Sequence, residues 1–163
     1  MANYDIRTLQ LYLLENLKTL HSVFKKHNLR YYLVSGTMLG AVRHKGFIPW
    51  DDDIDLGMTR ENYKRFLHEA PNHLDSQYTL QEYTTEPDTP FYFAKIRKRG
   101  TRFVESEWVG LPIEGGIYID IFPYDLIPDD PILERRQRER VKFWVNCFTA
   151  KSVWLWRWFG QAN

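Results

Sequence analysis

Apolar residues near the start of the chain recur at steps of three and four positions, which places them on one face of an α-helix. This pattern runs from Ile6 to Phe24, and Lys25 and Lys26 follow it, where the helix dipole favours cations. Similar patterns follow later in the chain. The sequence predicts helices over residues 5–27, 38–43, 60–70 and 131–148.

Runs rich in β-branched and aromatic residues predict strands between these helices. They cover residues 31–34, 53–58, 78–83, 91–97, 102–105 and 117–122. From Asp53 to Met58 charged and apolar residues alternate, which predicts a strand with one functional face and one core face. Because helices and strands are mixed and no repeat or linker interrupts them, we expect a single domain over residues 1–163, of class α+β or α/β.

Charge and cysteine content exclude several classes of function. The 22 basic and 21 acidic residues give a formal net charge of +1, which offers no electrostatic footprint for nucleic acid, so we expect no nucleic-acid partner. The single cysteine, Cys147, excludes an internal disulfide and a cysteine-rich zinc site, and we expect it to be a buried small hydrophobe. The histidines show no metal-ligand spacing along the sequence, so a catalytic metal would need oxygen ligands.

The two ends of the chain bear on localisation. The beginning lacks the basic start and continuous apolar core of a signal peptide, and no apolar run approaches 18 residues, so we expect a cytoplasmic protein. Residues 143–159 are apolar around the whole helix circumference and rich in tryptophan. They could be core, an interfacial helix, or the stump of a longer domain. We expect self-association, or binding to the inner face of the membrane, through this tail.

The strongest chemical signal is the acidic run from Asp51 to Asp55. Side chains alternate between the faces of a strand, so Asp53 and Asp55 point the same way. Two bare charges ~4 Å apart repel by about 1–4 kcal/mol near a surface. A hard divalent cation removes that cost, and Mg²⁺ takes carboxylate oxygens together with substrate phosphates.

A third acid, Asp120, lies in an otherwise apolar strand. Such a residue is costly to bury without a partner, and a metal site on a neighbouring strand would be one. An arbitrary acidic cluster is more often a solvated turn. Here the alternating pattern and the isolated Asp120 favour the metal site.

Two further stretches could bind phosphate. Ser35, Gly36 and Thr37 form a predicted turn before a helix, where backbone N–H groups can approach a phosphate, although a glycine turn is often only a turn. Lys95 and Arg97 share one face of a predicted strand and could bind phosphate groups. The alternative for this pair is a solvated edge strand.

Three motifs together resemble the LicD family of the nucleotidyltransferase superfamily, whose members include bacterial phosphocholine transferases and, distantly, fukutin-type phosphoribitol transferases. They are SGTMLGAVR over 35–43, GFIPWDDDID over 46–55 and GIYIDIFP over 116–123. The resemblance runs from about residue 12 to 125. It implies an α+β, polymerase-β-like nucleotidyltransferase fold with a mixed sheet flanked by helices. It also matches Asp53, Asp55 and Asp120 to the family's metal-binding acids, and Asp51 to a further acidic position.

The resemblance implies a Mg²⁺- or Mn²⁺-dependent enzyme. Such an enzyme transfers a phosphoalcohol, typically phosphocholine from CDP-choline, to a hydroxyl of a cell-surface glycan or glycolipid such as teichoic acid, lipopolysaccharide or capsule. Two alternatives stay open: a nucleotidyltransferase acting on a small molecule, and a truncated, non-catalytic binding module. Family members as a rule continue well past residue 163, so we expect a domain truncated at its C-terminus.

Overall fold

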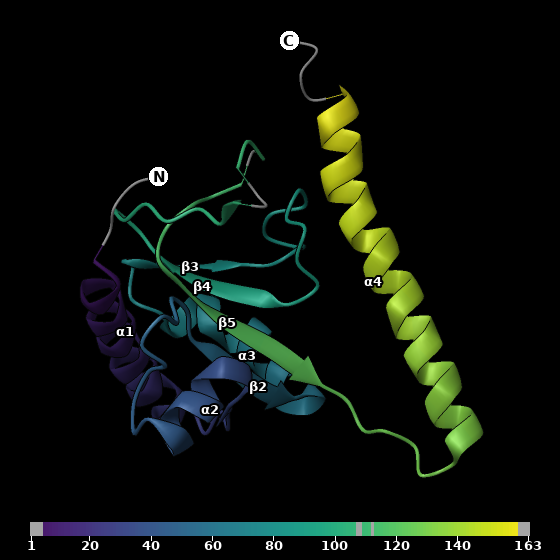
Figure 1. Ribbon diagram of the computed structural model, residues 1–163, viewed down its shortest axis with the longest axis horizontal. Coiled ribbons are helices and arrows are strands. Elements are labelled where there is room, and N and C mark those ends of the chain that lie inside the picture. Colours follow the sequence, from purple (N-terminus) through teal and green to yellow (C-terminus); the bar gives the residue numbers. More distant parts are fainter. Residues whose placement is uncertain (1–4, 107–108, 112, 160–163) are drawn as a thin grey trace.

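The structure is a computed structural model that describes residues 5–106, 109–111 and 113–159, with side chains up to residue 150 (Figure 1). The described residues form four helices and five strands. In chain order they are α1 (Ile6–Lys26), β1 (Tyr32–Leu33), α2 (Ser35–Arg43), β2 (Asp55–Thr59), α3 (Arg60–His73), β3 (Tyr78–Gln81), β4 (Ala94–Lys98), β5 (Tyr118–Tyr124) and α4 (Pro131–Phe159). The class is α+β.

The strands form one mixed sheet in the order β1-β2-β5-β4-β3. β2 and β5 run parallel, and every other neighbouring pair is antiparallel. β5 is the last strand in the sequence and lies at the centre of the sheet, so its side chains have neighbours on both sides (Figure 1).

The two faces of the sheet differ in chemistry because the side chains alternate along each strand. One face carries apolar residues such as Leu56, Ile96 and Ile121, which form the core together with residues of α1 and α3. The opposite face carries Asp55 on β2, Asp120 on β5, and Lys95 and Arg97 on β4. Helices α1 and α3 therefore cover one face, and the other face carries the polar side chains.

Most predicted elements are confirmed, with shifted ends. Thr59 caps α3 by accepting a hydrogen bond from Asn62 N–H, and the helix continues past the predicted end to His73. β2 begins at Asp55, so Asp53 precedes the strand. The predicted strand over 102–105 is wrong: a single backbone hydrogen bond, from Gly116 N–H to the Phe103 carbonyl, holds this segment where a ladder would be needed.

The predicted turn at residues 35–37 is also wrong, because these residues form the first turn of α2. Ser35 has a φ of +49°, which is in the left-handed region. A non-glycine residue in that region is strained, and such strain persists where the surroundings enforce it, often at functional sites. The strand-to-helix change thus takes place within one residue.

The last helix is longer than predicted and runs along the outside of the sheet layer (Figure 1). Asp130 caps it by accepting hydrogen bonds from the N–H groups of Ile132 and Leu133. Because α4 stands outside the core, Cys147 is exposed, and its predicted burial is wrong. Phe143 and Trp144 are exposed too. The side chains of the predicted tryptophan-rich tail from residue 151 onward lie outside the described residues.

Among the described residues, none of the helices combines the length and apolarity of a membrane span.

Candidate active site

A row of polar side chains crosses the face of the sheet opposite α1 and α3. Asp55 on β2 lies directly opposite Asp120 on β5, and Asp120 lies opposite Lys95 on β4. Gln81 on β3 continues the row opposite Lys95. Residues paired in this way place their side chains on the same face. The structure therefore puts Asp120 on the neighbouring strand that the sequence predicted, within one row of Asp55.

Lys95 and Asp120 form a buried ion pair at the centre of this row. Lys95 Nζ lies 2.9 Å from Asp120 Oδ1 and donates a hydrogen bond of 3.2 Å to Oδ2. Burial raises the pKa of Asp120 to about 7, and the Lys95 charge opposes that rise. Nζ also lies 3.6 Å from the ring centroid of Tyr118. Glu105, from the segment over this face, accepts a second contact from Nζ at 3.2 Å.

Asp51 and Asp53 lie in the loop that leads into β2. Burial raises the pKa of Asp53 to about 7, and the negative charges of Asp55 and Asp51 add to the effect. Asp51 Oδ2 is buried without a hydrogen-bond partner. The Gln10 side chain of α1 fixes the loop by donating 3.0 Å hydrogen bonds to the carbonyls of Ile48 and Asp51. These carboxylates are thus held close together at a cost in electrostatic free energy.

The first turn of α2 borders the acids. Thr37 Oγ1 accepts a 2.8 Å hydrogen bond from Asp55 N–H. Burial raises the pKa of Asp55, and a hydrogen bond from the Ser35 side chain opposes that rise. Gly36 lies against Asp51, because a Cβ at this position would stand 3.0 Å from Asp51 Oδ2. The predicted phosphate-binding residues therefore adjoin the acidic cluster.

Arg97 is on the same face as Lys95, and its guanidinium is hydrogen-bonded to other protein groups. Its guanidinium donates hydrogen bonds to Gln81 Oε1 at 2.6 Å and to the Gly116 carbonyl at 2.9 Å. Both basic side chains are buried, so the alternative of a solvated edge strand is wrong for them. Donor-phosphate binding by Lys95 and Arg97 stays a prediction, and in this structure the cations pair with protein groups.

The carboxylates do not converge to a single point. Among the described residues, Asp53, Asp55 and Asp120 do not form a group whose ligand atoms all lie within 4.8 Å of one another. Sequence reasoning also missed Glu105 and Gln10. Glu105 was assigned to a strand that does not form, and a buried glutamine on an amphipathic helix gives only a break in the apolar pattern.

A model of the LicD/FKTN/FKRP nucleotidyltransferase domain matches residues 28–148, a range that includes every candidate residue named from the sequence. The chain belongs to this LicD family. The resemblance of the three motifs is thereby confirmed.

The relatives differ in how much of this chain they match. The lipopolysaccharide cholinephosphotransferase LicD of Haemophilus influenzae is 33% identical over 167 residues, which cover 95% of this chain and 58% of that protein. The ribitol 5-phosphate transferases FKRP of mouse and human are 48% identical over 40 residues, or 24% of this chain and 8% of theirs. The chain thus spans less than two thirds of the length of these relatives.

Proposed function

We propose that this domain catalyses the Mg²⁺-dependent transfer of a phosphoalcohol, in the first instance phosphocholine from CDP-choline, to a hydroxyl of a cell-surface glycan. The observation that carries the proposal is the pairing of Asp55 with Asp120 on adjacent parallel strands, beside Asp51, Asp53 and the start of α2. The family match and the relative named lipopolysaccharide cholinephosphotransferase support the reaction class. We assign the mixed sheet to the polymerase-β-like nucleotidyltransferase fold, as one catalytic domain.

The acidic cluster suits a hard divalent cation. All its donors are carboxylate oxygens, the type that Mg²⁺ and Mn²⁺ prefer. Asp51 Oδ2 is buried and lacks a hydrogen-bond partner, whereas the buried Asp120 Oδ1 lies 2.9 Å from the Lys95 ammonium. Burial and mutual repulsion raise the pKa values of Asp53 and Asp120, so a nearby cation would restore their ionised state. Asp53, Asp55 and Asp120 would hold the ion, which when bound neutralises charge on the transferring phosphate.

The protein's own groups define where the donor can lie. The N-terminus of α2 presents backbone N–H groups beside Asp51, and Gly36, which has no side chain, lies directly against the Asp51 carboxylate. Lys95 holds Asp120 in place. In the reaction an acceptor hydroxyl oxygen bonds to the phosphorus that carries choline, the bond from that phosphorus to CMP breaks, and the hydroxyl proton is released. We propose that the reaction takes place on the cytoplasmic side, with lipopolysaccharide, teichoic acid or capsule as acceptor.

The test measures CMP release from CDP-choline with Mg²⁺ and a panel of lipopolysaccharide and teichoic acid acceptors. Asp120→Asn should abolish release, and Asp88→Asn, in an exposed loop, should not. Release of pyrophosphate from a nucleoside triphosphate instead would indicate nucleotidyl transfer to a small molecule. Binding of CDP-choline without turnover on any acceptor would indicate a binding module.

A further inference from the structure

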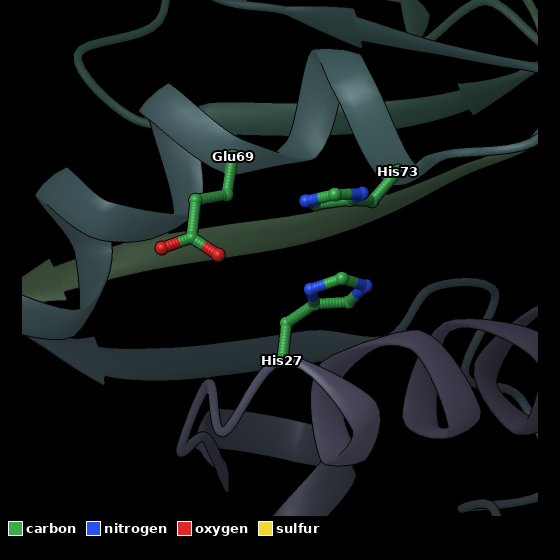
Figure 2. A group of neighbouring side chains, drawn as sticks. All are labelled: His27, Glu69 and His73. Atoms are coloured by element: carbon green, nitrogen blue, oxygen red, sulfur yellow. The ribbon is translucent and has the colours of Figure 1, made fainter.

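A second group of potential ligands lies where α1 and α3 end (Figure 2). His27 is the C-cap residue of α1, and Glu69 and His73 lie one turn apart on α3. Their ligand atoms all lie within 4.8 Å of one another. The two imidazole rings stack with their centroids 3.7 Å apart, at an interplanar angle of 18°. None of these residues belongs to the row of polar side chains that contains Asp55 and Asp120, or to the acidic loop before β2.

The backbone around this group is fixed by other contacts. Arg65 donates hydrogen bonds to the carbonyls of His27 at 3.1 Å and Asn28 at 3.4 Å, which tie the end of α1 to α3. Arg65 Nε also lies 3.7 Å from Glu69 Oε1, with both side chains partly exposed. An exposed pair at that distance is weak. It leaves the second carboxylate oxygen of Glu69 available.

We propose that His27, Glu69 and His73 bind Zn²⁺, or a transition-metal ion of similar ligand preference, with water as the fourth ligand. Two imidazoles and a carboxylate form a ligand set that zinc accepts, whereas Mg²⁺ favours oxygen alone. At a zinc–nitrogen distance of about 2.0–2.1 Å, tetrahedral ligand atoms stand roughly 3.3 Å apart. The ligand atoms of the three residues lie within 4.8 Å of one another, so the half-buried His27 and the exposed His73 side chains would need to move closer to reach that spacing.

This site is separate from the proposed catalytic site. Gln10 holds the acidic loop near the start of α1, and His27 lies at the other end of that helix. At 1.5 Å of rise per residue, the two are roughly 25 Å apart along the helix axis. The ion would therefore have a structural role, linking the ends of α1 and α3, and would take no part in the transfer reaction. The sequence alone did not predict this site because its two histidines come from different helices and are far apart in the chain.

The test is calorimetric titration of the full chain with Zn²⁺ in excess Mg²⁺. His73→Gln and His27→Gln should each weaken binding by more than about tenfold. The control His68→Gln changes the exposed residue next to Glu69 and should leave the affinity unchanged. Zn²⁺ should also raise the unfolding temperature of the wild type and of Asp53→Asn, but not that of His73→Gln.

Retained affinity in both histidine variants, or loss of binding in Asp53→Asn, would place zinc on the acidic cluster and overturn the proposal. A wild-type dissociation constant weaker than about 1 mM would do so as well. Glu69→Gln tests the third ligand while both rings are kept. Circular dichroism of each variant separates loss of the site from loss of the fold. If His27→Gln unfolds, Co²⁺ absorption is measured instead in the wild type and in His73→Gln, which changes an exposed residue. The proposal requires that bound Co²⁺ absorbs in the wild type and that His73→Gln loses this absorption.

Discussion

Removal of the Lys95 charge should expose the electrostatic cost of the acidic row. Lys95 is fully buried and lies 2.9 Å from the buried Asp120. Breaking a buried ion pair by removing one partner costs about 3–5 kcal/mol, because the remaining charge loses its compensation. For Lys95→Met we therefore expect a loss of about 3–5 kcal/mol in the free energy of unfolding at pH 8. That is a large share of a typical stability of about 5–15 kcal/mol.

The pH should set the size of this loss. With Lys95 present, Asp120 has a pKa of about 7, so in the wild type it is largely protonated at pH 5 and largely ionised at pH 8. The substitution should therefore cost less at pH 5. Glu105, the second partner of Lys95, is more exposed than Asp120 and can regain water, so it should contribute less to the loss.

Urea denaturation of a double-mutant cycle measures this coupling directly. Lys95→Met should cost at least about 2 kcal/mol less in an Asp120→Asn background than in the wild type, since the uncompensated charge is then gone. The matched control is Lys98→Met on the same strand, whose ammonium contacts Gln77 near the surface and should matter by about 0.5 kcal/mol or less. A coupling energy below about 0.5 kcal/mol would refute the reasoning.

Three further predictions concern the same face. Asp53→Asn should lower turnover by ~10² while the fold survives or gains slightly from reduced repulsion, as CMP release and thermal unfolding would report; full activity would remove Asp53 from the metal site. In the folded protein the pKa of Asp53 is raised from 3.8 to about 7, so without divalent ions Asp53 ionises at a lower pH in the unfolded chain than in the folded one. The free energy of unfolding should therefore fall as the pH rises from about 4 through 7. Urea midpoints at pH 5 and 8 test this, Mg²⁺ should flatten the slope, and a higher metal-free midpoint at pH 8 would contradict it. Arg97→Lys keeps the charge but loses the hydrogen bonds to Gln81 and the Gly116 carbonyl, so it should cost about 1–3 kcal/mol of stability; an unchanged CDP-choline affinity in calorimetry would show that Arg97 is structural and does not bind phosphate.

The sequence predicted those features that arise from local periodicity. The alternation from Asp53 to Met58 predicted the strand β2. The isolated Asp120 predicted that β5 would bring a further carboxylate to the site. Helical spacing gave α1 to within one residue at each end. Each of these patterns depends on residues that are close in the chain, so one sequence is enough to read it.

Features that depend on distant partners could not be predicted. The register that sets Asp55 opposite Asp120 and Asp120 opposite Lys95 joins three separate strands. The burial of Lys95 follows from that register, since its charge alone predicts exposure. Cys147 was predicted buried from residue type, yet α4 lies outside the core. The start of α2 at Ser35 needs a left-handed backbone that no propensity suggests.

The strand order makes the acidic row depend on the completed sheet. Asp51, Asp53 and Asp55 come early in the chain, but β5 is the last strand in the sequence and lies between β2 and β4. Until β5 is in place, Asp120 has neither Asp55 nor Lys95 beside it, and the ion pair does not exist. Parallel pairing of β2 with β5 closes a long loop, which is a slow kind of contact to form. A cation that needs Asp55 and Asp120 together therefore binds only the chain with its central strand inserted, so Mg²⁺ should slow unfolding more than it speeds folding.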